Sequence, residues 1–170
     1  NFENELKRIK AEGLRGVKLH PDFQLFQIDS PRMDAIYEVI TEMELPVIVH
    51  AGDKRYDFSG PKRIAHVLEK HPKIELIAAH FGGYSEWENS MEHLVGKKVW
   101  FDTSSSLFSL PVETANKMIR DHGYEKFLFG SDFPMWDHEG ELERFNKLDL
   151  TAEMRDAILY KNALRLLKED

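Results

Sequence analysis

Three histidines and one aspartate recur at regular intervals, each at the end of a short apolar run. His20, His50 and His80 are spaced 30 residues apart, and Asp132 follows the last of them by 52 residues. In parallel α/β folds, ligands bind at the carboxyl ends of the strands, so we expect these side chains to converge on one edge of a sheet. Imidazoles and a carboxylate suit Zn²⁺ or a similar divalent ion, and an open catalytic site needs about three such ligands.

Each of these residues also has a purely structural interpretation. Asp132 precedes Phe133-Pro134, where its carboxylate could cap a turn. Each histidine could instead be a hydrogen-bonded residue at a strand end, without any metal. The recurrence favours the metal interpretation, because one polar strand end is unremarkable whereas four equivalent ends converge on one face.

The elements that must position these side chains alternate between strands and helices. We predict strands at 15–20, 45–52, 74–80, 98–103 and 127–130, where apolar residues concentrate. We predict helices at 1–12, from a start at 30–31, from 61 to a break at 71–72, at 85–94, from 111 to 123, and from 151 onward. The alternation indicates an α/β fold with a parallel sheet, built from β/α units of roughly 30 residues.

Side-chain alternation along a strand predicts which residues share a face with the strand-end groups. If His50 points to one side of the sheet, Ile48 should point there too. By the same rule, Ala78 and Leu76 should share the face of His80. Aliphatic and small residues below a polar tip are typical of the filled interior of a (β/α)8 barrel.

Length and composition describe one globular domain spanning residues 1–170. Hydrophobic residues make up 42% and charged residues 31% of the chain. Its length of 170 residues is well short of the ~250 residues of a complete eight-fold barrel. A net charge of −7 without a basic stripe disfavours nucleic acid as a partner. There is no cysteine, so any metal must be held by the eight histidines and by carboxylates. No apolar run reaches the ~18 residues of a membrane span and no segment resembles a signal peptide, so we expect a cytoplasmic protein.

The strand ends also carry a resemblance to a known family. His50 in Val-Ile-Val-His-Ala-Gly, His80 in Ala-Ala-His-Phe-Gly-Gly and Asp132 in Phe-Gly-Ser-Asp-Phe-Pro resemble the later strands of the amidohydrolase superfamily. The segments Gly-Val-Lys-Leu-His-Pro at 16–21 and Lys-Asn-Ala-Leu-Arg-Leu-Leu at 161–167 resemble the amidohydrolase-related branch that includes aminocarboxymuconate-semialdehyde decarboxylase. The motifs are short, but their order and spacing match over essentially the whole chain.

The resemblance implies a TIM-type barrel of which strands four to eight are present. It implies that His50 binds a metal, and that Asp132 binds the same metal and takes the proton of its bound water. It implies that His80 acts as an acid or base, or as a ligand of a second metal. The activity would be hydrolysis or decarboxylation through a metal-activated water. Zinc is the ion we favour, with manganese or another divalent ion as alternatives.

One departure from the family is informative. The family's first strand carries a His-x-His pair that supplies two metal ligands, and this sequence has no His-x-His. The resemblance therefore implies that strands one to three are missing, and the chain begins with Asn1 instead of Met. Such a chain would leave two sheet edges unpaired, at 17–19 and 127–129. We expect an N-terminal segment, from the same polypeptide or another copy, to complete the barrel and to bring the two histidines.

Cationic and planar groups near the predicted mouth suggest the kind of substrate. Lys18 and His20 end the first strand, and Arg55 lies in the polar loop after His50. A small carboxylate-bearing substrate would suit these groups, although Arg55 could instead be a solvated loop residue. His138 could reach the mouth, whereas the other histidines fall on helices or helix ends and are expected at the surface: His66, His71, His93 and His122.

Two other functions stay open. A phosphoesterase or nuclease of the same superfamily would also use a metal. The net negative charge of the chain disfavours it, because a polyanionic substrate needs a positively charged surface. The second alternative is not an enzyme but a binding module, a barrel remnant without turnover. The presence or absence of a His-x-His pair upstream would decide between a binding module and an enzyme. We expect a small-molecule partner, no membrane or nucleic-acid partner, and allow for a homodimer.

Overall fold

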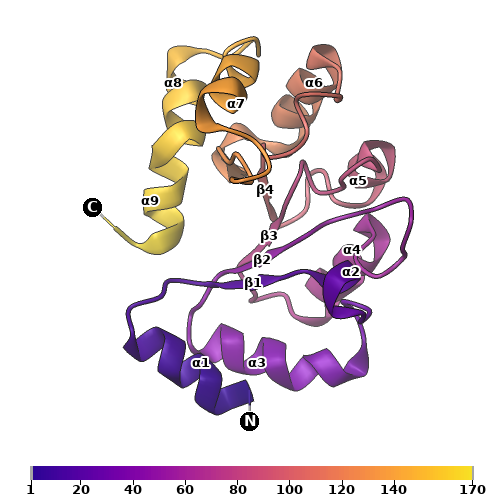
Figure 1. Cartoon of the computed structure of the whole chain (residues 1–170), viewed down its shortest axis with the longest axis vertical. Coiled ribbons are helices and arrows are strands. Elements are labelled where there is room, and N and C mark those ends of the chain that lie inside the picture. Colours follow the sequence, from indigo (N-terminus) through magenta and orange to yellow (C-terminus); the bar gives the residue numbers. More distant parts are fainter. Residues whose placement is uncertain (1, 170) are drawn as a thin grey trace.

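The computed structural model describes residues 2–169 as one parallel sheet with helices around it (Figure 1). The strands are β1 (Val17–Leu19), β2 (Val47–Val49), β3 (Leu76–Ala78), β4 (Trp100–Asp102) and β5 (Phe127–Leu128). They pair in chain order, and each pair is parallel. The predicted α/β class and all five predicted strands are confirmed, although the flanking residues included in the predictions lie in loops.

Helices connect the strands and follow the last one. They are α1 (Phe2–Ala11), α2 (Pro21–Gln24), α3 (Asp34–Glu42), α4 (Pro61–Lys70), α5 (Trp87–His93), α6 (Val112–His122), α7 (His138–Phe145), α8 (Ala152–Asp156) and α9 (Asn162–Leu167). Two short 3₁₀ turns are η1 (Pro31–Met33) and η2 (Tyr124–Lys126), and a π-helical segment, η3 (Ala157–Lys161), joins α8 to α9. Helices α2 and α7 were not predicted from the sequence.

Side-chain caps explain where three of these elements begin. Ser30 accepts a hydrogen bond from the backbone N–H of Arg32 at the start of η1, and Thr151 accepts one from Met154 at the start of α8. Both starts were predicted. The carboxylate of Asp137 accepts from Gly140 N at 2.7 Å and begins α7 in the same way.

The elements form an arc in Figure 1, from α1 and α3 beside β1 and β2 to α8 and α9 beyond β4. Helix α1 packs on α3, α4 packs on α5, and both η3 and α9 contact β5. Strands β1 and β5 are the two edges of the sheet, so the sheet does not close on itself within residues 2–169. In that part of the chain, no helix has both the length and the apolar character needed to cross a membrane.

Aromatic residues fill the core at the β4–β5 end of the sheet. Phe81, Phe101 and Phe127 are fully buried, and the ring centroid of Phe127 lies 5.2 Å from Phe81 and 5.4 Å from Phe101. His122, at the end of α6, stacks on Phe101 at 4.2 Å and donates its Nε2–H to the carbonyl of Val99. The predicted surface position of His122 is wrong, because this stacking buries the ring, and the burial lowers its pKa.

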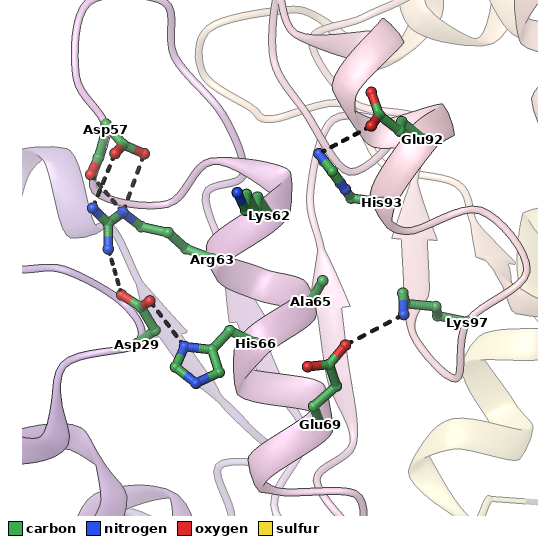
Figure 2. Close-up of a pocket in the computed structure, with 10 residues that line it drawn as sticks. All are labelled: Asp29, Asp57, Lys62, Arg63, Ala65, His66, Glu69, Glu92, His93 and Lys97. Atoms are coloured by element: carbon green, nitrogen blue, oxygen red, sulfur yellow. Dashed lines mark hydrogen bonds and ion pairs between the residues drawn. The ribbon is translucent and has the colours of Figure 1, made fainter.

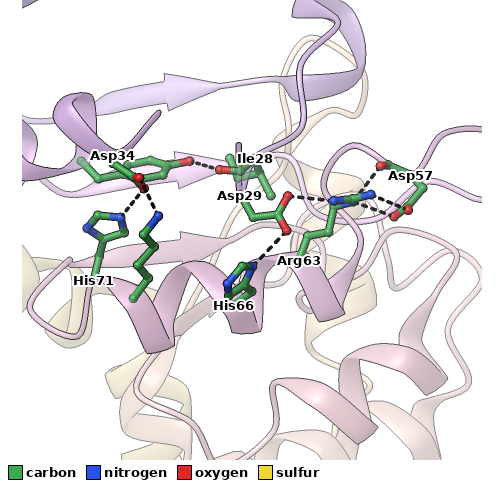
Figure 3. A network of polar contacts seen from close by, with 9 residues as sticks. Ile28, Asp29, Asp34, Asp57, Arg63, His66 and His71 are labelled. Atoms are coloured by element: carbon green, nitrogen blue, oxygen red, sulfur yellow. Dashed lines mark hydrogen bonds and ion pairs between the residues drawn. The ribbon is translucent and has the colours of Figure 1, made fainter. Parts of the chain in front are cut away.

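Charged side chains link α3 and α4 on the outside of the sheet, and Figure 3 shows this network. Asp29 accepts from Arg63 and pairs with the exposed His66, whose predicted surface position is confirmed. His71 bonds Asp34 at 3.0 Å and has a side chain that is only 11% exposed. The surface position predicted for His71 is therefore wrong, because contacts with α3 cover it.

Candidate metal centre at the ends of the strands

The three strand-end histidines lie against one another. His50 follows β2 and His80 follows β3, and Nδ1 of His50 is 3.0 Å from Nε2 of His80. The ring of His20, which follows β1, stacks on the ring of His50 with centroids 4.1 Å apart. The structure therefore brings the three histidines together at one edge of the sheet, while their chemical roles stay predictions.

The hydrogen bonds of His80 assign the tautomers of two imidazoles. Nδ1 of His80 lies 3.1 Å from the carbonyl oxygen of Ser104, which can only accept, so this nitrogen carries the proton. In a neutral ring Nε2 then accepts, and Nδ1 of His50 must be the donor to it. Nε2 of a neutral His50 is thus left with a free lone pair, and it is buried without a hydrogen-bond partner.

The surroundings of His50 keep its ring neutral. Burial, followed by the charges of His80 and His20, lowers the pKa of His50 to about 3. Histidine binds metals as the neutral imidazole, and the nitrogen that does not bind the metal normally donates to a second group. His50 meets both conditions, because Nε2 is unpartnered and Nδ1 donates to His80. On this observation His50 fits the metal ligand that the sequence predicts.

His80 is held by its backbone as well as by its ring. The residue is 2% exposed and has a left-handed φ of 63°. Its N–H donates to the carboxylate of Asp102 at 3.0 Å, and its carbonyl accepts from the indole of Trp87 at 3.1 Å. The hydroxyl of Ser104 donates to the same carboxylate and lies 3.0 Å from Nδ1 of His80. These bonds fix the ring against which His50 is oriented.

The left-handed backbone at His80 also breaks the alternation of side chains. Leu76 and Ala78 belong to the apolar core beneath the helices, whereas the ring of His80 faces His50. The prediction that these three residues share one face is wrong, because alternation holds only while the backbone is extended. Residues held at positive φ cost free energy and concentrate at functional sites.

Asp132 lies in an exposed loop beyond β5. Its Oδ2 accepts from the hydroxyl of Ser105 at 2.7 Å, and the same hydroxyl accepts from the indole of Trp136. Asp132 and Ser105 both have positive φ, of 61° and 46°. Across residues 2–169, no three histidine or carboxylate side chains are placed to hold one ion together. The metal role of Asp132 beside His50 therefore stays a prediction.

The predicted substrate-binding cations lie on either side of the histidines. Lys18 is exposed on β1, and after burial its charge is the next cause that lowers the pKa of His20. Arg55 is 71% exposed, but its guanidinium bonds both carboxylate oxygens of the buried Asp53. Arg55 is therefore a solvent-exposed loop residue whose guanidinium is held by Asp53, and its role in binding substrate stays a prediction.

Sequence reasoning missed three residues that contact this cluster. Asp102 and Ser104 support His80, and the serine run directly after the fourth strand is a signal that could have found the second of them. Asp22, in α2, places Oδ2 at 3.7 Å from Nε2 of His50. A single aspartate after the first strand gave no sequence signal for this placement.

A groove of about 630 Å³ lies between α4 and α5, away from the strand-end cluster (Figure 2). Its charged side chains pair with one another, as Glu69 does with Lys97 and Glu92 with the partly exposed His93. None of the strand-end histidines lines it. His138, which was expected to approach the mouth, is exposed and stacks on Phe133. The strand ends therefore remain the candidate site.

Comparisons with known proteins agree with this fold. A family model described as Amidohydrolase matches residues 2–168. An uncharacterised TIM-barrel protein from Bordetella bronchiseptica is 22% identical, with a TM-score of 0.76 over 97% of this chain and 61% of that one. A dihydroxybenzoic acid decarboxylase from Polaromonas sp. JS666, with bound manganese and the inhibitor 2-nitroresorcinol, is 15% identical, with a TM-score of 0.77 over 98% and 64%. A probable 2-pyrone-4,6-dicarboxylic acid hydrolase from Acinetobacter baumannii, with citric acid bound, is 21% identical, with a TM-score of 0.73 over 98% and 68%.

These likenesses show the fold, and with it the five parallel β/α units of the predicted TIM-type barrel. The chain spans 61–68% of the length of these three structures. The resemblance to the amidohydrolases that the sequence motifs carry is confirmed by the family model.

Proposed function

This chain belongs to the amidohydrolase family, and on that premise we propose that it is part of a metal-dependent hydrolase or decarboxylase. The substrate we propose is a small organic molecule that bears a carboxylate. The observation that carries the proposal is the neutral imidazole of His50, whose buried Nε2 has no partner. Two of the similar structures are named for carboxylated ring compounds, and one of them holds manganese.

In this proposal Nε2 of His50 and the carboxylate of Asp132 hold a divalent ion, with zinc favoured and manganese as the alternative. Such an ion, when bound, lowers the pKa of its water to about 7 and polarises a substrate oxygen. Asp132 accepts a proton at Oδ1, the oxygen that is not bonded to Ser105. The bond from Ser105 orients the carboxylate for this task.

His80 supports His50 and is also the proposed acid or base. As an acceptor for Nδ1–H of His50, it keeps the Nε2 lone pair of His50 free. Proton transfer to substrate uses Nε2 of His80, because Nδ1 is engaged by Ser104. Nε2 of His80 must give up its hydrogen bond to His50 before it can contact the substrate. It would have to give up the same bond to become a ligand of a second metal.

Lys18, His20 and Arg55 are the groups we propose for the substrate's carboxylate and ring. Lys18 and Arg55 supply positive charge, and Asp53 fixes the direction of the Arg55 guanidinium. The ring of His20 is already stacked on Phe23 at 3.8 Å, so it presents a planar surface at the mouth. A cytoplasmic location and a homodimer complete the proposal.

Turnover by an Asp132→Asn variant tests this function in the complete native protein. Aromatic and pyrone carboxylates are supplied as substrates, and release of carbon dioxide or opening of the ring ester is measured. The amide keeps the shape of the carboxylate but cannot take the proton, so we expect the rate to fall by at least about 100-fold. Asp137→Asn changes a carboxylate in the same loop and should leave the rate unchanged, because Asn also caps α7. Equal rates in the two variants would mean that Asp132 only caps a turn.

A further inference from the structure

A buried carboxylate faces the unpartnered nitrogen of His50. The side chain of Asp22 is 2% exposed, and its Oδ2 lies 3.7 Å from Nε2 of His50. Oδ1 of Asp22 and Nε2 of His50 are both buried without a hydrogen-bond partner. The hydroxyl of Ser59 donates to Oδ2 of Asp22 at 3.4 Å. Two polar groups that the fold takes out of water therefore point at each other.

With these tautomers, Nε2 of His50 and Oδ2 of Asp22 are both hydrogen-bond acceptors. Nδ1 of His50 carries the proton that is donated to His80, so Nε2 offers a lone pair and no hydrogen to Asp22. Burying a carboxylate without a compensating partner is costly, and the same holds to a lesser degree for an imidazole nitrogen. A positively charged group between the two atoms would satisfy both.

The spacing of the two atoms suits a metal ion. Ligand nitrogens and oxygens lie ~2.0–2.2 Å from zinc, so two ligands of one ion can be up to roughly 4.2 Å apart. The 3.7 Å between Oδ2 of Asp22 and Nε2 of His50 is within that limit. The ring of His20 covers one face of His50, and its own buried Nδ1 also lacks a partner.

The other buried carboxylate at this edge makes a useful contrast. The side chain of Asp53 is 5% exposed, nearly as little as that of Asp22, but both of its oxygens accept from the guanidinium of Arg55. Its charge is therefore already compensated by a group of the chain. Within residues 2–169 no lysine or arginine bonds Asp22 directly, which sets it apart as the carboxylate that needs an external cation.

We propose that Asp22 is a ligand of the divalent ion bound by His50, so that α2 and the end of β2 supply a carboxylate–imidazole pair to it. This inference rests on the proposed function, because it assumes that an ion binds at His50. It adds a ligand that the sequence motifs do not assign.

Cobalt(II) binding by the complete native protein tests the inference without any substrate. Metal-free wild-type, Asp22→Asn, Asp53→Asn and His50→Ala proteins are titrated with cobalt(II), and its visible absorption band is followed. We expect Asp22→Asn to weaken binding by at least about 10-fold, because the site loses a charged ligand. Asp53→Asn removes an equal charge at the same edge and should change the affinity by less than about threefold.

The variants also separate this inference from the function on which it rests. Binding in Asp22→Asn that equals wild type, together with loss in His50→Ala, would overturn the role of Asp22 and leave the metal-dependent function standing. A wild-type protein that binds no cobalt(II) would overturn both. If thermal melting shows that Asp22→Asn does not fold, Asp22→Ser replaces it, with the same expected loss and the same refuting result.

Discussion

The turn after β3 presents His80, and substitution of Gly82 by alanine tests how tightly that turn is packed. Gly82 has a φ of +72°, and an added Cβ would lie 2.5 Å from a ring carbon of Phe101 and 2.6 Å from the hydroxyl of Ser90. Carbon atoms at their optimal separation are about 3.5–4.0 Å apart, so the methyl group cannot fit without displacing its neighbours. The hydroxyl of Ser90 also donates to the carbonyl of Phe81, so its displacement would loosen the turn itself.

Two costs contribute to the expected loss of stability. A left-handed backbone costs a residue with a Cβ about 1–2 kcal/mol, and overpacking a close-packed core costs about 1–3 kcal/mol more. Gly96→Ala is the matched control, because Gly96 has a φ of +80° and nothing within 4 Å of the added Cβ. Urea unfolding should therefore show Gly82→Ala to be less stable than Gly96→Ala by about 1–3 kcal/mol. Equal free energies of unfolding would refute the packing argument at this turn.

Two further changes test the core that supports the site. Burial holds the pKa of His122 below its usual value near 6.5, and Nδ1 accepts from Gly96 N–H, so the unfolded state takes up more protons below that pH. The unfolding free energy should fall as the pH is lowered from 7 to 5, and it should fall less in His122→Gln, which does not titrate. Asn162 is 3% exposed and donates to the carbonyls of Tyr124 and Phe127 at 2.8 Å, so Asn162→Ala should cost about 2–5 kcal/mol in urea unfolding. A loss below about 0.5 kcal/mol would show that these two bonds do not hold α9 to the sheet.

The parts of the fold that the sequence predicts are those that local patterns determine. The run from Val47 to Val49 is β-branched and continuous, and it forms β2 as expected. Ser30 and Thr151 begin helical segments through hydrogen bonds to residues two or three positions away. Helix α7 was not predicted, although Asp137 caps it in the same manner. Local capping and periodicity are visible in a sequence, and they account for these successes.

The parts that the sequence does not predict depend on contacts between distant residues. His122 was expected at the surface because it falls at a helix end, yet it stacks on Phe101, which lies 21 positions earlier in β4. His80 was expected to follow the alternation of β3, and a positive φ redirects it. Asp22 meets His50 across 28 positions of chain, and no local pattern marks that contact. The spacing of the histidines indicated where the site lies. The hydrogen bonds of the site and the position of Asp22 within it could be learned only from the structure.

Metal content of the purified protein is the most direct test of the central claim, that His50 binds a catalytic divalent ion. The complete native protein and its His50→Ala variant are dialysed identically and analysed for zinc and manganese. His66→Ala serves as the control, because His66 is an exposed histidine that pairs with Asp29 outside the strand-end cluster. We expect wild type and His66→Ala to retain about one ion per chain and His50→Ala to retain almost none, because the site loses its neutral imidazole ligand. An unchanged metal content in His50→Ala would contradict the account.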